Sequence, residues 1–220
     1  MILHTFTLTL DPACPIHGSA QELRGFFAAQ CAGYTGLHQD EAGTFIYRYP
    51  VVQYKTIDRI PTVIGINEGA QVLKQISDAS QKIRLGTGTF TITGHSAAIK
   101  AEEFGIADTI RPYEFATSWL PFSQENYKRF YKLKGKEERD EFVRKSLVRN
   151  ISSLSKSLGY DIPVPIRCDT NLHFQKDRKD GVSVMAFTGK FQVNFLIPDL
   201  LGIGRSVSYG FGAVQQTPPK

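Results

Sequence analysis

The sequence predicts an α+β fold of two successive domains, each with a small antiparallel sheet covered by helices on one face. The chain has 220 residues, of which 41% are hydrophobic, so it can bury the cores of two small domains. Strand-like and helix-like segments follow the order β-α-β-β-α-β in the first half, and the second half repeats this order imperfectly. We therefore expect an N-terminal domain at residues 1–108 and a C-terminal domain at residues 109–220.

The N-terminal domain begins with a strand over residues 2–10, where apolar residues alternate with threonines. Ser19 and Glu22 then form the pattern of a capping box, which predicts the start of a helix, and Gly33 predicts its end. The remaining elements are expected as strands near residues 44–49, 62–66 and 87–93 and a helix near residues 68–79.

The C-terminal domain begins with a predicted strand over residues 111–120, and a basic helical region follows to residue 132. A longer helix is expected over residues 136–158, because apolar residues recur at helical spacing and Gly159 follows them. Its expected buried residues are Phe142, Leu147, Ile151, Leu154 and Leu158. A hairpin and a short last strand complete the domain; the hairpin comprises residues 167–174 and 182–197, with a turn at Asp180–Gly181.

The element order of the first half is that of the ferredoxin-like, or RRM-like, plan, in which two helices cover one face of a four-stranded antiparallel sheet. In the second half the helix between the hairpin and the last strand is missing, and a glycine-rich stretch takes its place. The sequence therefore predicts two tandem ferredoxin-like domains. The second lacks its second helix and carries a C-terminal glycine-rich loop.

The glycine-rich loop, residues 201–214, is the most distinctive motif of the chain. Glycines tolerate positive φ and the close approach of a ligand, and consecutive N–H groups can bind an anion beside an arginine. The loop therefore predicts contact with a phosphodiester backbone. The expected contact residues are Gly202, Gly204, Arg205, Ser206, Ser208, Gly210, Phe211 and Gly212. The alternative is a hairpin-like connection in which the glycines serve only turn geometry.

Two better-known glycine motifs do not fit this loop. The dinucleotide-binding fingerprint needs a third glycine where Val207 stands, and only eight residues follow Gly212. A Walker loop needs Gly-Lys-Ser or Gly-Lys-Thr, and Gly189–Lys190 is followed by Phe191.

Basic residues gather in the second half of the chain. Residues 1–110 contain 8 Lys/Arg and 10 Asp/Glu, whereas residues 111–220 contain 18 and 11, so the net charges are −2 and +7. Lys145, Arg149 and Lys156 are expected near one stripe of the long helix. This distribution favours nucleic-acid binding, because Lys and Arg release counterions from phosphates. A solvated, solubilising surface is the alternative.

Cysteine spacing and hydropathy point to a protein of the reducing cytoplasm. The three cysteines show no Cys-x-x-Cys spacing, and the sequence shows no signal peptide and no apolar run that could span a bilayer. Acidic residues cluster only at Glu102–Glu103 and over residues 137–141, where the helix dipole accounts for them. No His/Cys set has zinc spacing, so we expect no metal. We also expect no membrane partner, because no apolar run could span a bilayer.

Two features of the sequence together match a known pattern. Tandem ferredoxin-like units precede a stretch of the form G-x-G-x-x-x-x-x-G-F-G, and the first half contains an LRGFF helix, a loop with His38, and the segments FIYRYPVVQYK and PTVIGINEG. In both features the chain resembles the CRISPR-associated repeat-RNA processing endoribonucleases of the RAMP superfamily. The resemblance implies a metal-independent endoribonuclease without a cofactor, which cleaves CRISPR repeat RNA (pre-crRNA) to give mature guide RNAs. It allows other CRISPR effector-complex proteins and a second copy of the chain as further partners.

The resemblance also implies a set of catalytic residues. The family carries its catalytic histidine in the loop after the first helix, which is the position of His38. An imidazole with a pKa of about 6.5 can move protons at neutral pH while the adjacent 2′-hydroxyl attacks phosphorus. Tyr47 and Tyr49 share one face of the expected strand and match a tyrosine that assists the histidine. Lys55 follows on the same segment, where it would neutralise charge on the phosphate.

Other interpretations of these residues and of the whole chain stay open at this point. An exposed loop histidine without a role, tyrosines that only pack and a solvated lysine are the alternatives at the four catalytic positions. For the chain, one alternative is a catalytically inactive RNA-binding subunit of a CRISPR ribonucleoprotein complex. Another is an assembly component whose positive half meets an acidic partner.

Overall fold

The structure is a computed structural model that describes residues 1–30, 49–76, 81–179 and 181–218. Its contacts divide the chain into two compact units. The N-terminal unit contains Ile2–Glu102 and, from the far end of the chain, Val207–Gly210. The C-terminal unit contains Met1, Glu103–Ser206 and Phe211–Lys220. The domain boundary that we expected at residue 108 stays a prediction.

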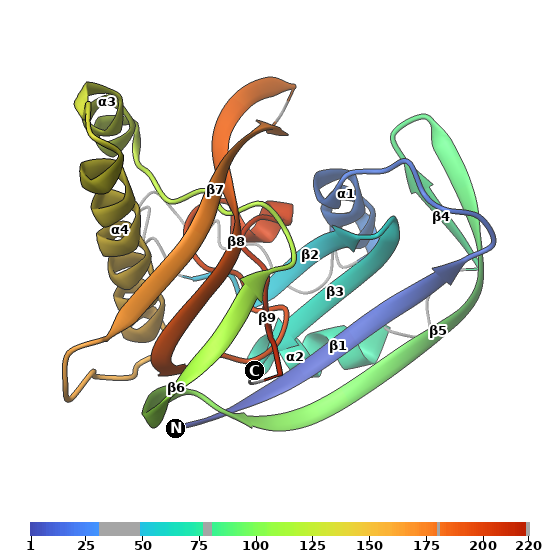
Figure 1. Ribbon diagram of the computed structural model, residues 1–220. Helices are drawn as coiled ribbons and strands as arrows, with labels where there is room; N and C mark the ends of the chain where they lie inside the picture. The colour runs from blue at the N-terminus through green and yellow to red at the C-terminus, as the bar shows by residue number, and fades with distance from the viewer. Residues whose placement is uncertain (31–48, 77–80, 180, 219–220) are drawn as a thin grey trace, which may run out of the picture. The chain divides into compact units, whose positions relative to one another are not determined.

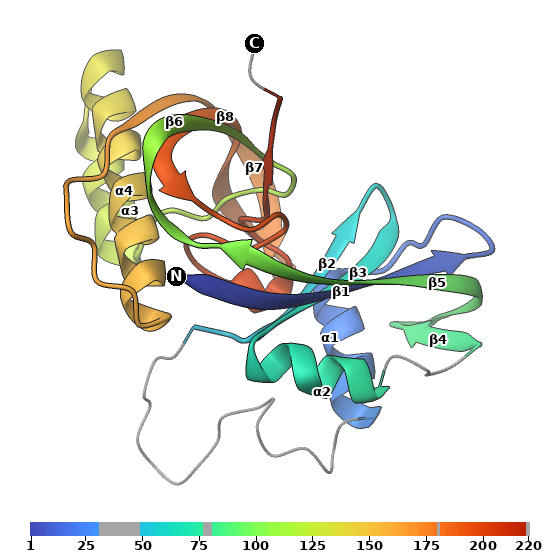
Figure 2. The ribbon, with the colours of Figure 1, turned by 90° about the horizontal axis from the view of Figure 1, so that it is seen from below.

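The N-terminal unit is a five-stranded sheet with the strand order β2-β3-β1-β5-β4. Its elements in chain order are β1 (Ile2–Pro12), α1 (Ala20–Gln30), β2 (Val52–Ile57), β3 (Ile60–Ile66), α2 (Glu68–Ile76), β4 (Lys82–Leu85) and β5 (Gly88–Glu103) (Figure 1). Both helices lie on the same side of the sheet (Figure 2). This is the predicted ferredoxin-like arrangement with one additional strand.

The start of α1 is fixed by the expected capping box. The Ser19 backbone N–H donates to Glu22 Oε2 over 2.7 Å, and the Glu22 N–H donates to Ser19 Oγ over 3.2 Å. These reciprocal bonds satisfy two N–H groups that have no acceptor within the helix. The local sequence alone therefore determines where this helix begins.

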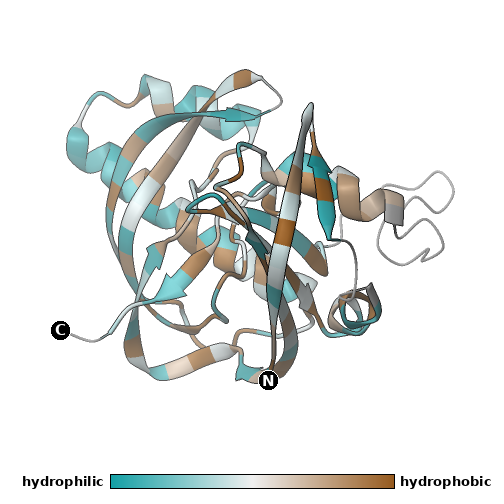
Figure 3. Ribbon diagram, turned by 90° about the vertical axis from the view of Figure 1, so that its right-hand side faces the viewer, coloured by the Kyte–Doolittle hydropathy of each residue, from teal (hydrophilic) through white to brown (hydrophobic). Residues whose placement is uncertain are grey.

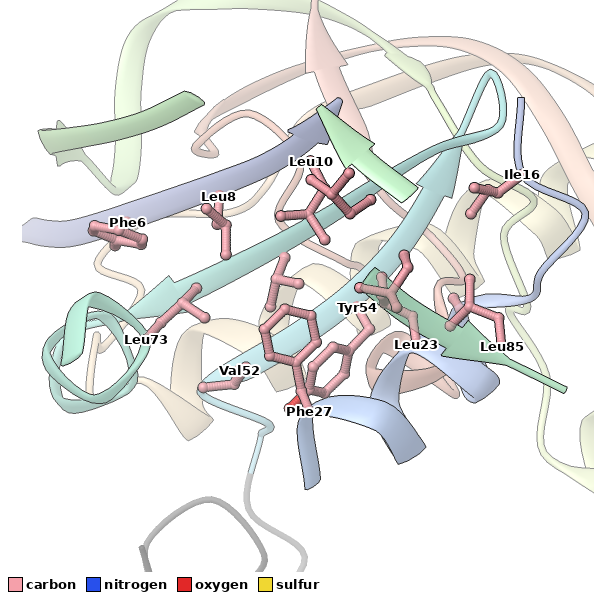
Figure 4. Packing of buried hydrophobic residues seen from close by; sticks show 14 of the residues in the cluster. Phe6, Leu8, Leu10, Ile16, Leu23, Phe27, Val52, Tyr54, Leu73 and Leu85 are labelled. Carbon is pink, nitrogen blue, oxygen red and sulfur yellow. The ribbon is translucent and has the colours of Figure 1, made fainter. Parts of the chain in front are cut away.

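The core of the N-terminal unit lies between the sheet and its helices. Phe6, Leu8 and Leu10 of β1 are buried, and Figure 4 shows them in one cluster with residues of α1 and β2. The rings of Phe27 and Tyr54 lie 5.9 Å apart within this cluster. Apolar and polar bands alternate along the strands in Figure 3, as the two-residue period of a half-buried strand requires.

Two expected strands of this unit need comment. The strand expected near residues 44–49 falls almost wholly outside the described residues, so it stays a prediction. The structure contains β2 over Val52–Ile57, which the sequence did not predict as a separate strand. The strand expected near residues 87–93 continues to Glu103 in the structure. The prediction missed its second half, because that half is mostly exposed and lacks the alternation that marks a half-buried strand.

The C-terminal unit is a four-stranded antiparallel sheet with the strand order β7-β8-β6-β9. Its elements are β6 (Gly105–Phe115), α3 (Gln124–Lys132), α4 (Lys136–Ser157), β7 (Cys168–Lys179), β8 (Val182–Leu196) and β9 (Val214–Gln216). The predicted hairpin is confirmed, with continuous pairing from Cys168 opposite Val193 to Lys179 opposite Val182. Between β8 and β9 the described chain forms only the short 3-10 helix η1 (Val207–Tyr209), so the second helix is missing as expected.

The long helix α4 packs its apolar face inward. Leu147, Ile151 and Leu154 are buried as predicted, whereas Phe142 and Leu158 are only half-buried. Phe142 lies at the edge of the core, where the guanidinium groups of Arg129 and Arg149 cover its ring at 5.8 and 5.7 Å. Gly159 follows the helix with a φ of +77°, a conformation that glycine adopts without steric cost.

The first strand of this unit lies earlier in the chain than the expected residues 111–120. It covers Gly105–Phe115, and the apolar residues after it belong to a connection in which Trp119 forms an isolated bridge to Phe187. The Trp119 ring is buried and stacks on Phe115 at 5.2 Å. The apolar residues after Phe115 therefore belong to the core without being part of the strand.

None of the helices in the described residues is both long and apolar enough to cross a membrane.

Candidate functional site

The glycine-rich loop forms a narrow hairpin-like connection. Its two sides pair through the bridge between Gly202 and Ala213 and through the Ile203 N–H, which donates to the Gly212 carbonyl over 2.8 Å. This is the turn-geometry alternative that the sequence left open. The backbone of the loop is therefore held by its own protein contacts.

Several N–H groups that we expected to bind an anion donate to protein carbonyls instead. The Arg205 N–H donates to the Leu120 carbonyl over 3.1 Å, and the Gly212 N–H donates to the Ser118 carbonyl over 2.8 Å. The Phe211 N–H donates to Ser206 over 3.4 Å. Because these donors are already satisfied, they are not available to a phosphate in this conformation.

The glycines of the loop are explained by close packing. A Cβ atom on Gly204 would lie 2.6 Å from Trp119 Nε1, and one on Gly212 would overlap the Ile203 carbonyl oxygen. Both glycines also have positive φ, at +91° and +71°. Gly202, Gly210, Phe211 and Gly212 are buried. The burial of these four residues agrees with the turn-geometry alternative, and direct RNA contact by them stays a prediction.

Three polar side chains of the loop remain accessible. Arg205 is exposed and its guanidinium has no hydrogen-bond or ion-pair partner among the described residues. Ser206, in the same C-terminal unit, and Ser208, in the N-terminal unit, are half-exposed. Ser206 has a φ of +56°, which is unusual for a residue with a side chain. Arg205 is therefore the residue of this loop best placed to meet a phosphate.

The segment Val207–Gly210 packs on α1 and β2 within the N-terminal unit. Arg24 of α1 donates from Nη1 to the Tyr209 hydroxyl over 3.0 Å, and its guanidinium lies 5.0 Å from the centre of the Tyr209 ring. A Cβ atom on Gly210 would lie 2.5 Å from the Ala20 Cβ, so only glycine permits this approach. The sequence reasoning missed Arg24, although it noted the LRGFF stretch that contains it.

Lys55 is the most unusual ionisable group of the N-terminal unit. It lies on β2 and is fully buried, and its ammonium donates to Gln53 Oε1 over 3.1 Å and to the Val207 carbonyl over 3.5 Å. Burial lowers the pKa of Lys55 from 10.5 to about 7. This environment differs from the solvated one suggested by the sequence, and the ammonium faces the protein. A direct role of Lys55 at a phosphate stays a prediction.

The remaining catalytic candidates lie in or beside the part of the chain that is not described. His38 and Tyr47 are outside the described residues. Tyr49 is half-buried and precedes β2. It does not lie in that strand, so the alternation of strand side chains does not determine which way it faces. Among the described residues no group of three or more His, Cys, Asp or Glu side chains could hold a metal ion.

The cationic stripe of α4 has the geometry that the sequence predicted. Lys145, Arg149 and Lys156 are exposed and recur at helical spacing on one side of the helix. Lys145 pairs with Glu141 over 3.2 Å, and Arg149 donates from Nη2 to Ser146 Oγ over 2.9 Å. Exposed pairs of this kind contribute little stability, so the charges remain available to a polyanion.

Comparison with known families decides the relationship of the chain. A model of the Cas6b C-terminal domain matches residues 105–217, and a model of the Cas6b N-terminal domain matches residues 1–103. The chain belongs to the Cas6b family. The resemblance to CRISPR-associated endoribonucleases that the sequence motifs suggested is thereby confirmed.

Solved structures of Cas6b proteins are similar to this Cas6b chain over nearly its full length. A crystal structure of Cas6b is 32% identical with a TM-score of 0.88, and it covers 99% of this chain and 100% of its own. A crystal structure of a CRISPR RNA processing endoribonuclease Cas6b is 31% identical with a TM-score of 0.80 and the same coverage. A Cas6 product complex at 12% identity, with a TM-score of 0.61 over 98% of this chain and 99% of that one, shares the fold.

An uncharacterized protein of Methanocaldococcus jannaschii is also similar in sequence. It is 35% identical over 136 residues, which are 61% of this chain and 91% of that protein. Together with the solved structures, these matches confirm the predicted α+β fold of tandem ferredoxin-like units.

Proposed function

We propose that this Cas6b chain processes CRISPR repeat RNA by cutting it without a metal ion, through attack of a 2′-hydroxyl on the neighbouring phosphate. The observation that carries the proposal is the 31% identity, over 99% of the chain, to a solved CRISPR RNA processing endoribonuclease. The net charge of +7 on residues 111–220 supports RNA as the ligand, because phosphates bind through released counterions. Further proteins of an effector complex and a second copy of the chain stay predicted partners.

In the proposed reaction the 2′-oxygen gives its proton to a base and bonds to phosphorus, while the P–O5′ bond breaks. The leaving 5′-oxygen takes a proton from an acid, so the products are a 2′,3′-cyclic phosphate and a 5′-hydroxyl. We assign the proton transfers to His38, because imidazole is the side-chain group that can both accept and donate a proton near neutral pH. Tyr47 and Tyr49 are assigned to the support of the nucleophile or of the phosphorane.

The RNA backbone is proposed to contact cations of the C-terminal unit. Arg205 offers an exposed planar guanidinium that suits a phosphate, and Lys145, Arg149 and Lys156 offer an exposed stripe. These contacts would fix the position of the RNA without reading its sequence. Binding is therefore expected to weaken steeply as the salt concentration rises.

The experiment that tests this function is a cleavage assay in EDTA with the repeat transcript of the same genome. The wild-type chain and a His17→Ala control are expected to cut, since His17 is exposed on the connection before α1. His38→Ala is expected to cut roughly 10²- to 10⁴-fold more slowly, which is the range of general acid–base catalysis. The downstream fragments should accept a 5′-phosphate from polynucleotide kinase without prior dephosphorylation.

Three outcomes would contradict parts of the proposal. Cleavage that stops in EDTA and returns with Mg²⁺ would show that the reaction needs a metal. Equal rates of the wild type and His38→Ala would remove His38 from the mechanism. Tight RNA binding without any cleavage by the wild type would instead identify an RNA-binding subunit.

A further inference from the structure

The C-terminal unit contains a pocket between its two helices and the edge strand of its sheet, which we call the α3–β7 pocket. It has a volume of about 610 Å³ and is lined by the end of α3, the start of α4, and strands β7 and β8. Figure 1 shows α3 and α4 alongside β7. The pocket lies outside every residue assigned above to catalysis or to phosphate contact. Its size is that of pockets that hold drug-sized ligands, a class that includes a single nucleotide.

The floor of the pocket is apolar. It is formed by the buried side chains of Phe130, Val143, Met185 and Phe187. The guanidinium of Arg139 lies 5.7 Å from the centre of the Phe130 ring, and Arg139 Nε donates to the Leu133 carbonyl over 2.8 Å. This bond joins the start of α4 to the residue that ends α3. The floor therefore presents an apolar surface to a ligand.

Two aromatic side chains rise from this floor into solvent. Tyr131 is 58% exposed and Phe174 is 50% exposed. Both are held by neighbours: the Tyr131 ring lies 4.9 Å from that of Tyr127, and Phe174 is paired across the hairpin with Phe187, with ring centres 6.2 Å apart. Exposed rings fixed in this way are the platforms on which unpaired bases stack.

The rim of the pocket is positively charged. Lys134, Lys136, Arg139 and Lys176 line it, with Asp140 as the only acidic residue among the described lining residues. Within the described chain none of the three lysines forms an ion pair with an acidic side chain. A rim of unpaired cations around an apolar floor suits a ligand that combines a flat apolar ring with a negative backbone.

We propose that the α3–β7 pocket binds an unpaired nucleotide of the RNA substrate, with the base stacked on Tyr131 or Phe174 and the flanking phosphates on the rim cations. This inference rests on the proposed function, because it takes its ligand to be the RNA that the chain processes. It adds a binding site remote in sequence from His38. Bases recognised in this way are single-stranded, since a base within a duplex has no free face for an aromatic ring.

The first test measures RNA affinity by fluorescence anisotropy. The probe is the repeat RNA with a 2′-deoxyribose at the nucleotide whose bond is cut, or the unmodified RNA if no cleavage occurs. Whichever of Tyr131→Ala and Phe174→Ala removes the stacked ring is expected to raise Kd roughly five- to hundredfold, the range for loss of one stacked base. Tyr131→Phe keeps the ring and should bind like the wild type, as should Val182→Ala, which shortens a 64% exposed side chain outside the pocket.

The second test separates rim cations from general charge. In a plot of log K against log salt concentration the slope is negative. Lys176→Met should make this slope less steep by about 0.7, the value for one phosphate of a single strand. Lys190→Met removes the same charge from an exposed lysine outside the pocket, paired with Glu114 over 3.6 Å. It should leave the slope nearly unchanged. Circular dichroism and Trp119 fluorescence verify that all variants are folded.

The third test locates the RNA directly. Repeat RNA that carries 4-thiouridine is irradiated on the full chain, and crosslinked peptides are expected to contain Tyr131 or Phe174. Crosslinks found only elsewhere, or alanine variants that bind like the wild type, would overturn the proposal. Displacement of the RNA by polyglutamate without a crosslink at the pocket would point to an acidic protein partner instead, and would also overturn it.

The tests keep this inference distinct from the cleavage reaction. Pocket variants are expected to need more protein for half-maximal cleavage, by the same factor as their loss of RNA affinity, because the pocket is proposed to supply binding. Loss of affinity in Phe174→Ala with no cleavage by the wild type would refute the endoribonuclease activity and keep the pocket. Normal cleavage by the wild type together with unchanged RNA affinity of the pocket variants would keep the endoribonuclease activity and refute the pocket.

Discussion

The buried ammonium of Lys55 makes the stability of the N-terminal unit depend on pH. In the folded chain its pKa is about 7, whereas in the unfolded chain the group keeps its ordinary value of 10.5. A tenfold difference in proton affinity corresponds to about 1.4 kcal/mol, so burying the charged form costs roughly 5 kcal/mol at pH values below 7. Between pH 7 and 10.5 the unfolded state binds more protons, and the free energy of unfolding therefore rises with pH.

Replacement of this lysine by methionine removes the titration. Met has a similar length and no charge, so Lys55→Met should abolish the increase, which amounts to roughly 2–3 kcal/mol between pH 6 and pH 9. The variant also removes the hydrogen bonds from Lys55 to Gln53 Oε1 and to the Val207 carbonyl, at about 0.5–1.5 kcal/mol for each bond. That cost is the same at both pH values. The difference in slope is thus specific to the buried charge.

The measurement is urea-induced unfolding followed by circular dichroism at pH 6 and at pH 9. Other groups titrate in this range, so the relevant quantity is the change in the wild type minus the change in Lys55→Met. Lys100→Met is the matched control, because Lys100 lies on β5 in the same unit and is exposed. If the wild type and Lys55→Met gain the same stability from pH 6 to pH 9, the argument from burial is wrong.

Two further predictions concern the C-terminal unit and the free thiols. Gly159→Ala should cost about 1–2 kcal/mol of unfolding free energy for its positive φ alone, since a Cβ atom there meets open space. Gly212→Ala should cost about 1–3 kcal/mol more, because its Cβ atom would also overlap a backbone carbonyl. The measurement is urea-induced unfolding followed by tryptophan fluorescence, and equal losses of unfolding free energy in the two variants would contradict the prediction. At pH 8 Ellman's reagent should label the exposed Cys14 quickly in a Cys31→Ser background and Cys168 only slowly, because burial raises the pKa of Cys168 to about 12.

Elements with strong local signals could be predicted from the sequence. The strand over β1 follows from alternation, the start of α1 follows from the Ser19–Glu22 pair, and the end of α4 follows from Gly159. Each of these signals acts over a few residues, where propensity and capping decide the outcome. The order of such elements along the chain was enough to suggest the fold.

Features that depend on distant residues could not be predicted in the same way. Lys55 contacts Val207, 152 positions away, and Arg24 contacts Tyr209, 185 positions away. The sequence left open whether Lys55 meets a phosphate or solvent and whether the glycines of the loop bind a phosphate or only form a turn, because it gives no information on which surfaces cover them. The second half of β5 was missed for a related reason, since its exposed residues carry no hydrophobic period.

The packing of Val207–Gly210 onto α1 and β2 has a consequence for biosynthesis. A domain at the start of a chain commonly folds while the ribosome is still translating the rest. Here the leading unit lacks four of its own residues until the chain has been translated past residue 210, so Ala20, Arg24 and Lys55 remain without their final neighbours until then. In a nascent chain stalled before residue 207 the packing of this unit would be incomplete, and synthesis of Val207–Gly210 would complete it.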